Sequence, residues 1–143
     1  MNLSRLAGAL TGLSLSTLFL LGATAAPASA AAPGCTGNSC TGKNPHTQRC
    51  DRDAKTIAIA HNPEGPSAYL RYSAACTAAW VISDKGDGAW RFKLDIKRGK
   101  PYVEQASPNY NAYTAMVSAH KAYRACYEAA TGRSNDWECT GWH

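Results

Sequence analysis

The sequence lacks the motifs that mark common enzyme active sites. It has no nucleophile elbow, paired-carboxylate motif or metal-ligand motif that would place a nucleophile or an activated water within reach of a general base. Of the four histidines, His61 heads a turn and His143 is the last residue, and His46 and His120 belong to no such motif. We therefore expect a protein that is not an enzyme and has no catalytic residue, bound metal or cofactor.

Long apolar runs are scarce as well. The uncharged stretch Leu6–Leu21 has 16 residues, fewer than the 18 or more of a membrane span. Arg5 precedes it, and the small residues after it include Ala28-Ser29-Ala30, which matches the A-x-A cleavage pattern. We predict a signal peptide at 1–30 and one disulfide-stapled domain at 31–143, secreted and without a membrane span. The alternative, an uncleaved anchor, would need a stop-transfer flank, and none follows the run.

Six cysteines distinguish the chain that follows Ala30. This part has 113 residues, and its 14 basic and 10 acidic side chains give a net charge of +4. An even number of cysteines in an exported chain predicts three disulfides, formed here among Cys35, Cys40, Cys50, Cys76, Cys126 and Cys139. Each bridge contributes about 2 to 4 kcal/mol, against roughly 6 to 15 kcal/mol for a whole domain of this size. We therefore expect the reduced protein to be marginally stable.

Residues 33–55 contain three of these cysteines but almost no aliphatic side chain. Gly, Pro, Asn and Thr predominate, so we expect an ordered loop pinned by its cysteines. The spacing of Cys35, Cys40, His46 and Cys50 is similar to that of a zinc knuckle, in which thiolates and an imidazole complete a tetrahedron. Knuckles use a tighter first cysteine pair, so we expect disulfides at this position and no metal.

Alternating apolar residues predict a mainly β domain, a small antiparallel sheet or barrel. A short strand is expected at 56–61. Between 69 and 82 every even position is apolar, and residues 90–96 repeat the alternation, including Trp80 and Trp90 in the inward set. A Gly-rich turn separates these two runs, so we expect them to form an antiparallel hairpin. A weaker strand is expected at 102–106.

The C-terminal segment permits two interpretations. Apolar residues at about 113–130 fit a helical stripe, which would give an α+β fold. A hairpin centred on Gly132-Arg133 would instead place Cys126 opposite Cys139, close to bridging range. We favour a strand from about Lys121 and a Cys126–Cys139 bridge. The other four cysteines then have three connectivities open to them.

The cysteine-containing segments are similar to those of a known family. The similar segments are Cys35-Thr-Gly-Asn-Ser-Cys40-Thr-Gly-Lys-Asn-Pro45, Cys50-Asp-Arg-Asp-Ala54, Leu70-Arg-Tyr-Ser73 and Cys139-Thr-Gly-Trp142. Over nearly all of the mature length the chain resembles the YjfA-like family of small exported bacterial proteins, grouped as a domain of unknown function. The resemblance implies a mainly β domain and supplies no activity. Family members tend to have Asp before the proline where this chain has Asn44, which weakens a cation-binding role for the loop.

A row of basic residues is the one feature that indicates a binding mechanism. Arg91, Lys93 and Lys97 project from one strand face, with Asp95 opposing them. Such a row can bind phosphates or other polyanions. The other interpretation is a solvated face that keeps the sheet soluble and discourages edge pairing.

We expect a secreted, non-enzymatic interaction module that binds an extracellular protein or a cell-envelope polymer. An extracellular protein is the first expected partner, an anionic envelope polymer is the second, and nucleic acid is not expected. One alternative is an inhibitor of an extracellular hydrolase such as a protease, in which the loop 34–55 enters the active-site cleft. Another is a small secreted enzyme or toxin component with an unrecognised site. The sequence leaves the oligomeric state open.

The export and disulfide predictions are tested by one intact-mass measurement. The purified exported protein should begin at or near Ala31 and weigh six hydrogens less than its reduced form, because three disulfides remove six thiol hydrogens. A retained N terminus would contradict the leader, and six free thiols would contradict the disulfides.

Overall fold

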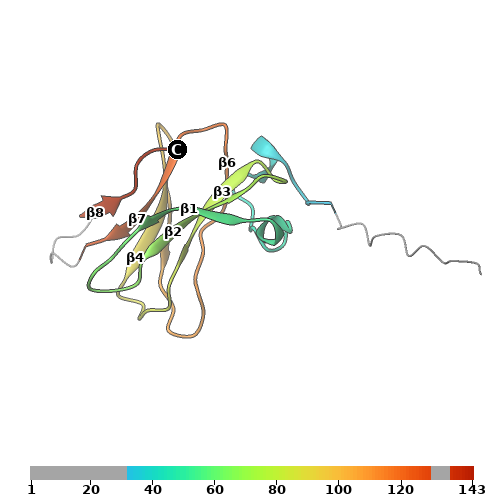
Figure 1. Ribbon diagram of the computed structural model, residues 1–143. Helices are drawn as coiled ribbons and strands as arrows, with labels where there is room; N and C mark the ends of the chain where they lie inside the picture. Colours follow the sequence, from blue (N-terminus) through green and yellow to red (C-terminus); the bar gives the residue numbers. More distant parts are fainter. Residues whose placement is uncertain (1–31, 130–135) are drawn as a thin grey trace, which may run out of the picture. The chain divides into compact units, whose positions relative to one another are not determined.

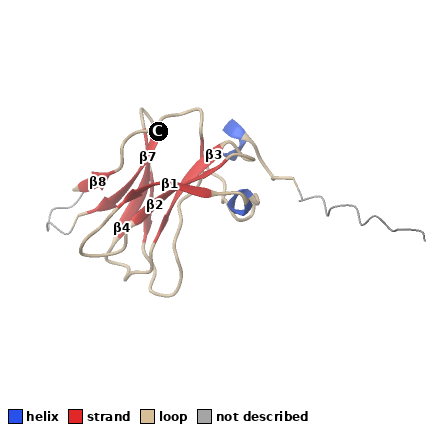
Figure 2. Ribbon diagram, viewed as in Figure 1, coloured by secondary structure: helices blue, strands red, loops and turns tan. Residues whose placement is uncertain are grey.

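The computed structural model describes residues 32–129 and 136–143. These residues form two four-stranded antiparallel sheets and two short 3-10 helices (Figures 1 and 2). The elements are η1 (Gly37–Cys40), η2 (Cys50–Arg52), β1 (Lys55–Ala60), β2 (Ala68–Ser73), β3 (Ala78–Ser83), β4 (Arg91–Ile96), β5 (Tyr102–Gln105), β6 (Val117–Ser118), β7 (Tyr123–Glu128) and β8 (Trp137–Cys139). The predicted mainly β fold with three disulfides is confirmed.

The two sheets pack against each other around a hydrophobic core. One sheet has the strand order β1-β2-β3-β6 and the other β5-β4-β7-β8. Leu70 of β2 and Val81 of β3 belong to the same core as Phe92 and Leu94 of β4 and Ala125 of β7, and each is at most 2% exposed. Burial of a large apolar side chain stabilises a fold by about 1.5 to 3 kcal/mol. The facing side chains therefore hold the two sheets together as a sandwich.

The expectation that residues 69–82 form one strand is wrong. β2 ends at Ser73 and β3 begins at Ala78, and the two strands form a hairpin. In the intervening turn the Ser73 hydroxyl accepts a hydrogen bond from the backbone N–H of Cys76 at 3.0 Å. The Asp53 carboxylate accepts bonds from the Ser73 hydroxyl at 2.6 Å and from the Ala75 N–H at 2.9 Å. Because Asp53 lies twenty residues earlier in the chain, alternation alone does not reveal this turn.

The expected hairpin between residues 69–82 and 90–96 is wrong as well. β3 pairs with β2 and β6, whereas β4 pairs with β5 and β7, so the segment between β3 and β4 crosses from one sheet to the other. In a sandwich the inner faces of both sheets are apolar. Two strands therefore show the same alternation whether they are neighbours in one sheet or face each other across the core.

The alternation also changes phase at the β2–β3 turn. In β2 the even-numbered Leu70 lies in the sandwich core, but in β3 the odd-numbered Ala79 and Val81 do. Trp80 lies on the other face of β3, where it is 2% exposed and belongs to a second core cluster. Trp80 is thus buried as predicted, but outside the sandwich core, and Trp90 is half-buried.

The second core cluster consists mainly of cysteines. Cys35, Cys40, Cys50 and Cys76 pack with Ala78, Trp80 and Met116. The bridges are Cys35–Cys40 and Cys50–Cys76, which selects one of the three connectivities left open by the sequence. Backbone hydrogen bonds tie the same loop to the sheet, from Gly37 N–H to the Cys76 carbonyl at 2.7 Å and from Gly42 N–H to the Met116 carbonyl at 2.9 Å. The predicted pinned loop is confirmed.

The C-terminal segment forms strands in its described part, so the alternative helix at 113–130 is wrong. In β7 the side chains of Tyr123, Ala125 and Tyr127 lie in the sandwich core. Cys126 pairs in register with Cys139 of β8, and the two form the predicted disulfide. The predicted turn at Gly132-Arg133 lies outside the described residues. Apolar spacing alone could not exclude the helix, because β6 and β7 are buried by strands distant in sequence.

The predicted signal peptide at 1–30 lies outside the described residues. The described residues belong to one compact unit, Ala31–His143. No helix in 32–129 or 136–143 is long and apolar enough to cross a membrane.

The hydrogen bonds to Asp53 predict that the free energy of unfolding decreases at acidic pH. Burial alone would raise the pKa of Asp53, but the hydrogen bonds from Ser73 and Ala75 outweigh it and lower the pKa below its usual value. The stabilisation is therefore present above the unfolded-state pKa and is lost as the pH falls through the folded-state pKa. Asp53→Asn should lower the free energy of unfolding at pH 7 by about 1 kcal/mol, which is below the roughly 1.5 to 3 kcal/mol of hydrogen bonds to charged groups because Asp53 is exposed.

Urea unfolding of the wild type and Asp53→Asn at pH 7 and pH 3 measures this difference. It should shrink at pH 3, because this pH lies below the ordinary pKa of an Asp carboxyl, so the unfolded chain binds the proton and the stabilisation begins to be lost. An equal difference at both pH values would contradict the assigned role of the carboxylate charge.

Candidate functional site

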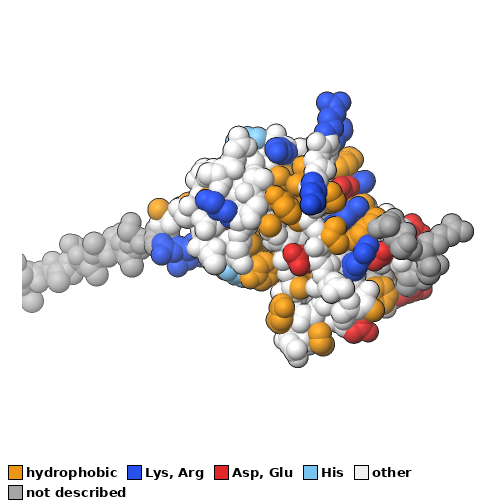
Figure 3. All heavy atoms as spheres, turned by 180° about the vertical axis from the view of Figure 1, so that it is seen from behind, with side chains coloured by type: hydrophobic (Ala, Val, Ile, Leu, Met, Phe, Trp, Pro, Cys, Tyr) orange, Lys and Arg blue, Asp and Glu red, His pale blue; other side chains and the backbone are white. Residues whose placement is uncertain are grey.

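The outer face of the sheet β4-β7-β8 carries the predicted basic residues. Phe92, Leu94 and Ile96 of β4 are buried, so the intervening Arg91 and Lys93 point away from the core. The alternation predicted for this strand is confirmed. Figure 3 shows a face of the protein on which Lys and Arg side chains lie among hydrophobic ones, with a few acidic side chains between them.

Strand pairing neutralises part of this charge. Arg91 forms a two-contact ion pair with Glu128 of β7, from its Nε at 2.7 Å and from an Nη at 3.0 Å. Asp95 pairs in register with Arg124 of β7 and accepts a hydrogen bond from the Arg124 Nε at 2.9 Å. Paired-fork contacts of this kind fix side-chain geometry as well as adding attraction. Arg91 thus forms an ion pair with Glu128. The sequence had suggested instead that Arg91 is available to bind a polyanion.

Two tryptophans from the last strand and tail lie against these cations. The Lys93 Nζ is 4.3 Å from the centre of the Trp137 ring, and the Arg91 guanidinium is 5.3 Å from it. The Arg124 guanidinium is 4.3 Å from the Trp142 ring, which is 42% exposed. Cations over aromatic faces gain electrostatic attraction, and more so when desolvated. Burial also lowers the pKa of Lys93, an effect that Asp95 partly opposes.

Beyond the end of β4 the chain forms a basic hollow. Lys97, Arg98 and Gly99 from the turn after β4 line it together with Ile96 and with Lys121 and Ala122 before β7, and its volume is about 390 Å³. The Lys97 N–H donates a 2.9 Å hydrogen bond to the Ala122 carbonyl, which joins the two segments. We call Lys97, Arg98 and Lys121 the basic hollow. No acidic side chain lines it, and in the described residues none of its three cations forms an ion pair.

The structure therefore divides the predicted row Arg91, Lys93 and Lys97. Arg91 and Lys93 lie with Trp137 on the strand face, and Lys97 lies in the hollow at the strand end. The sequence analysis missed Lys121 and Arg124, because it did not foresee that β7 pairs with β4. Isolated basic residues in a segment with two open interpretations gave no local signal for this pairing.

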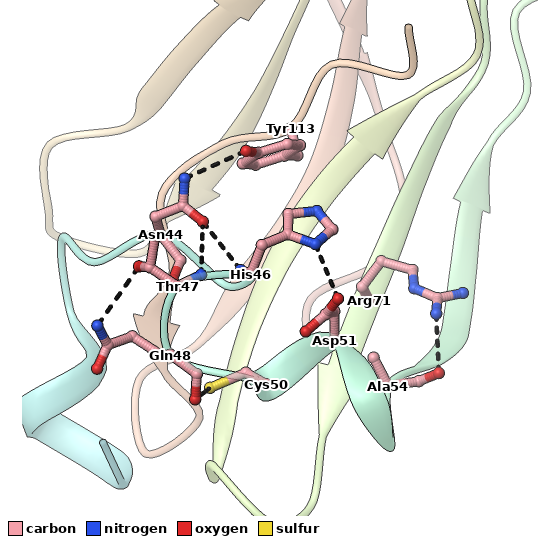
Figure 4. Close-up of polar contacts among 9 residues, drawn as sticks. All are labelled: Asn44, His46, Thr47, Gln48, Cys50, Asp51, Ala54, Arg71 and Tyr113. Atoms are coloured by element: carbon pink, nitrogen blue, oxygen red, sulfur yellow. Dashed lines mark hydrogen bonds and ion pairs between the residues drawn. The ribbon is translucent and has the colours of Figure 1, made fainter. Parts of the chain in front are cut away.

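A second polar cluster lies in the N-terminal loop (Figure 4). His46 Nδ1 is 2.8 Å from Asp51 Oδ2. The His46 and Tyr113 rings are in edge-on contact, with 4.5 Å between their centres. The Asn44 side chain bonds to the Tyr113 hydroxyl at 3.2 Å and accepts bonds from the backbone N–H groups of His46 and Thr47.

These contacts organise the loop. The Asn44 side chain closes a local turn in the manner of Asn residues elsewhere. A carboxylate can orient an imidazole for general-base catalysis, but such a base also needs a nucleophile within reach. In the described residues the His46 ring has no hydrogen bond to a hydroxyl or thiol. The geometry supports a structural role for this cluster.

The other aromatic residues divide between core and surface. Tyr127 is buried, and its hydroxyl donates a 2.6 Å hydrogen bond to Glu138 of β8. Burial, with the Glu138 contact adding to it, raises the pKa of Tyr127 to about 12. Tyr110 is 61% exposed and lies with Val103 beside a separate polar hollow at β5. Neither Tyr127 nor Tyr110 has a cation–aromatic contact in the described residues, in contrast to Trp137 and Trp142.

Comparison with known proteins identifies a family to which the chain is similar. A family model described as a protein of unknown function, DUF2690, matches residues 38–127. No curated protein and no solved structure matches the chain. The matched region runs from η1 into β7, which is more than half of the sequence and includes strands of both sheets but not β8. The chain therefore belongs to the DUF2690 family of proteins of unknown function.

Proposed function

We propose that the protein is an exported, non-enzymatic binding module for an anionic envelope polymer. The observation that carries the proposal is the basic hollow of Lys97, Arg98 and Lys121, whose cations form no ion pair within residues 32–129 and 136–143. Three disulfides are compatible with an extracellular location, where such bridges persist. Envelope polymers with repeated phosphate or carboxylate groups match a site made of unpaired cations.

The neighbouring strand face supports the same proposal. A polymer chain is longer than the hollow and would continue over the surface beside it. Lys93 provides a cation backed by the Trp137 ring on the same sheet, and the exposed Trp142 ring lies beside Arg124, whose charge is paired with Asp95. Aromatic faces bury the apolar faces of a polymer unit while the cations bind its charges. We also propose that the chain is YjfA-like within its wider family, on the strength of the cysteine-containing segments quoted above.

Charge removal in the hollow tests the proposal. Lys97→Gln, Arg98→Gln and Lys121→Gln together should abolish binding to isolated bacterial cell walls that carry phosphate polymers. The three side chains are exposed, so their replacement should change the free energy of unfolding by no more than about 0.5 kcal/mol each. Wild-type affinity should fall roughly 20- to 40-fold between 50 and 200 mM salt if three phosphates are contacted.

A matched control removes the same charge elsewhere. Lys43→Gln, Lys55→Gln and Lys85→Gln remove three exposed cations outside the hollow. This variant should bind as the wild type does, and walls stripped of phosphate polymer should bind neither protein. Equal loss in both triple variants would show that only net charge matters, and salt-independent binding would overturn the proposal.

The inhibitor hypothesis keeps one specific observation in its favour. The loop with η1 and η2 is held by two disulfides and by backbone hydrogen bonds. Its insertion into a cleft would therefore cost little conformational entropy. Exposed Asn38, Ser39 and Lys43 are among the side chains of the loop that are available for contact. Inhibition of a secreted protease that is lost in Lys43→Ala but kept in the hollow variant would favour this second candidate.

A further inference from the structure

We propose that, when its two N-terminal disulfides are reduced, the protein binds one zinc ion through Cys35, Cys40, Cys50 and Cys76. The proposal is independent of polymer binding, because these cysteines lie in a different cluster from the basic hollow. It concerns the reduced chain, such as exists in a reducing compartment.

The four sulfurs already occupy a space of the right size. Their Sγ atoms all lie within 4.8 Å of one another. The Sγ atoms of Cys35 and Cys50, which belong to different bridges, are 3.9 Å apart. A tetrahedral zinc site with Zn–S bonds of about 2.3 Å has sulfurs about 3.8 Å apart. Breaking the two bridges would let the sulfurs within each pair separate to that distance.

Contacts other than the disulfides hold the cysteine backbones in place. The Gly37 N–H bonds to the Cys76 carbonyl, and the Cys50 N–H bonds to the Pro45 carbonyl at 2.9 Å. Met116 exchanges backbone hydrogen bonds with Gly42 and Lys43, both at 2.9 Å. Asp53 fixes the turn that carries Cys76 through its bonds to Ser73 and Ala75. These bonds do not depend on the oxidation state of sulfur.

The surroundings suit a structural metal. Cys40, Cys50 and Cys76 are fully buried and Cys35 is 6% exposed, and the cluster is closed by Trp80 and Met116. Structural zinc sites are four-coordinate with thiolate ligands and no open position. Four buried thiols without a metal would leave weak donors in an apolar pocket, whereas zinc binds thiolates directly.

The chemistry balances without a further oxidant. Two equivalents of a dithiol reduce the two bridges, giving four protein thiols and two molecules of the cyclic disulfide. Zinc then binds four thiolates and releases four protons to solvent. In the reverse exchange two molecules of the cyclic disulfide accept two electrons each and the four protons, which regenerates the dithiol, re-forms both bridges and releases the metal.

The geometry selects Cys76 as the fourth ligand where the sequence suggested His46. The His46 ring is directed to Asp51 and Tyr113 and is 47% exposed. Cys76 follows the other three cysteines by at least 26 residues in the chain, so the knuckle spacing could not include it. Only the β2–β3 turn brings it to the loop.

The test titrates cobalt(II) into the reduced protein under anaerobic conditions. Cys126→Ser and Cys139→Ser are introduced first. They remove the third disulfide and also a second possible metal-binding group, which consists of Asp95, Cys126 and Cys139. One cobalt per chain should give the visible spectrum of a tetrahedral thiolate site, and zinc should displace it. Zinc should also restore the near-ultraviolet circular dichroism of the oxidised protein if the metal-free reduced form has lost it.

Two further variants identify the ligands. Adding Cys76→Ser should weaken binding by more than the roughly 10- to 100-fold that loss of a supporting contact costs. His46→Ala should leave the affinity and the spectrum unchanged. Absence of the tetrahedral spectrum, retention of the site in Cys76→Ser, or its loss in His46→Ala would each overturn the proposal.

Discussion

The burial of β3 on both faces is the constraint on which the rest of the structure depends. Ala79 and Val81 lie in the sandwich core, and Ala78 and Trp80 lie in the cysteine cluster. A strand buried on both sides must be covered twice. The second sheet provides one cover and the N-terminal loop provides the other. Because the loop has few aliphatic residues, the sulfurs of its cysteines supply much of the apolar surface that covers Trp80.

The opposite sheet likewise separates side chains that fill the core from side chains that form surface contacts. The inner residues of β4 and β7 fill the core, and their outer residues form two ion pairs and three cation–aromatic contacts. Both ion pairs are partly buried at the surface, and fully exposed pairs contribute usually under about 1 kcal/mol each. Their main effect here is to position side chains. At the sheet end, the three exposed cations of the basic hollow form no ion pair among the described residues and lie outside the core.

Local patterns predicted some elements well and others only in part. The alternation in β4 and the register of Cys126 with Cys139 were correct, because a period of two and a short hairpin are both properties of adjacent residues. The β2–β3 turn was missed because the group that stabilises it, Asp53, comes from another segment. Of the candidate site, the row on β4 was predicted, whereas Lys121 and Arg124 join it only through the pairing of β4 with β7.

The sequence by itself determined the mainly β class, the even set of disulfide-forming cysteines and the outward direction of Arg91 and Lys93. These follow from composition and from the alternation of side chains along a strand. Only the tertiary structure decided that β3 and β4 belong to different sheets, that Cys50 bonds to Cys76, and that Glu128 neutralises Arg91. The physical reason is that each of these depends on a contact between segments far apart in the chain, whose energy appears only when both sheets are packed together.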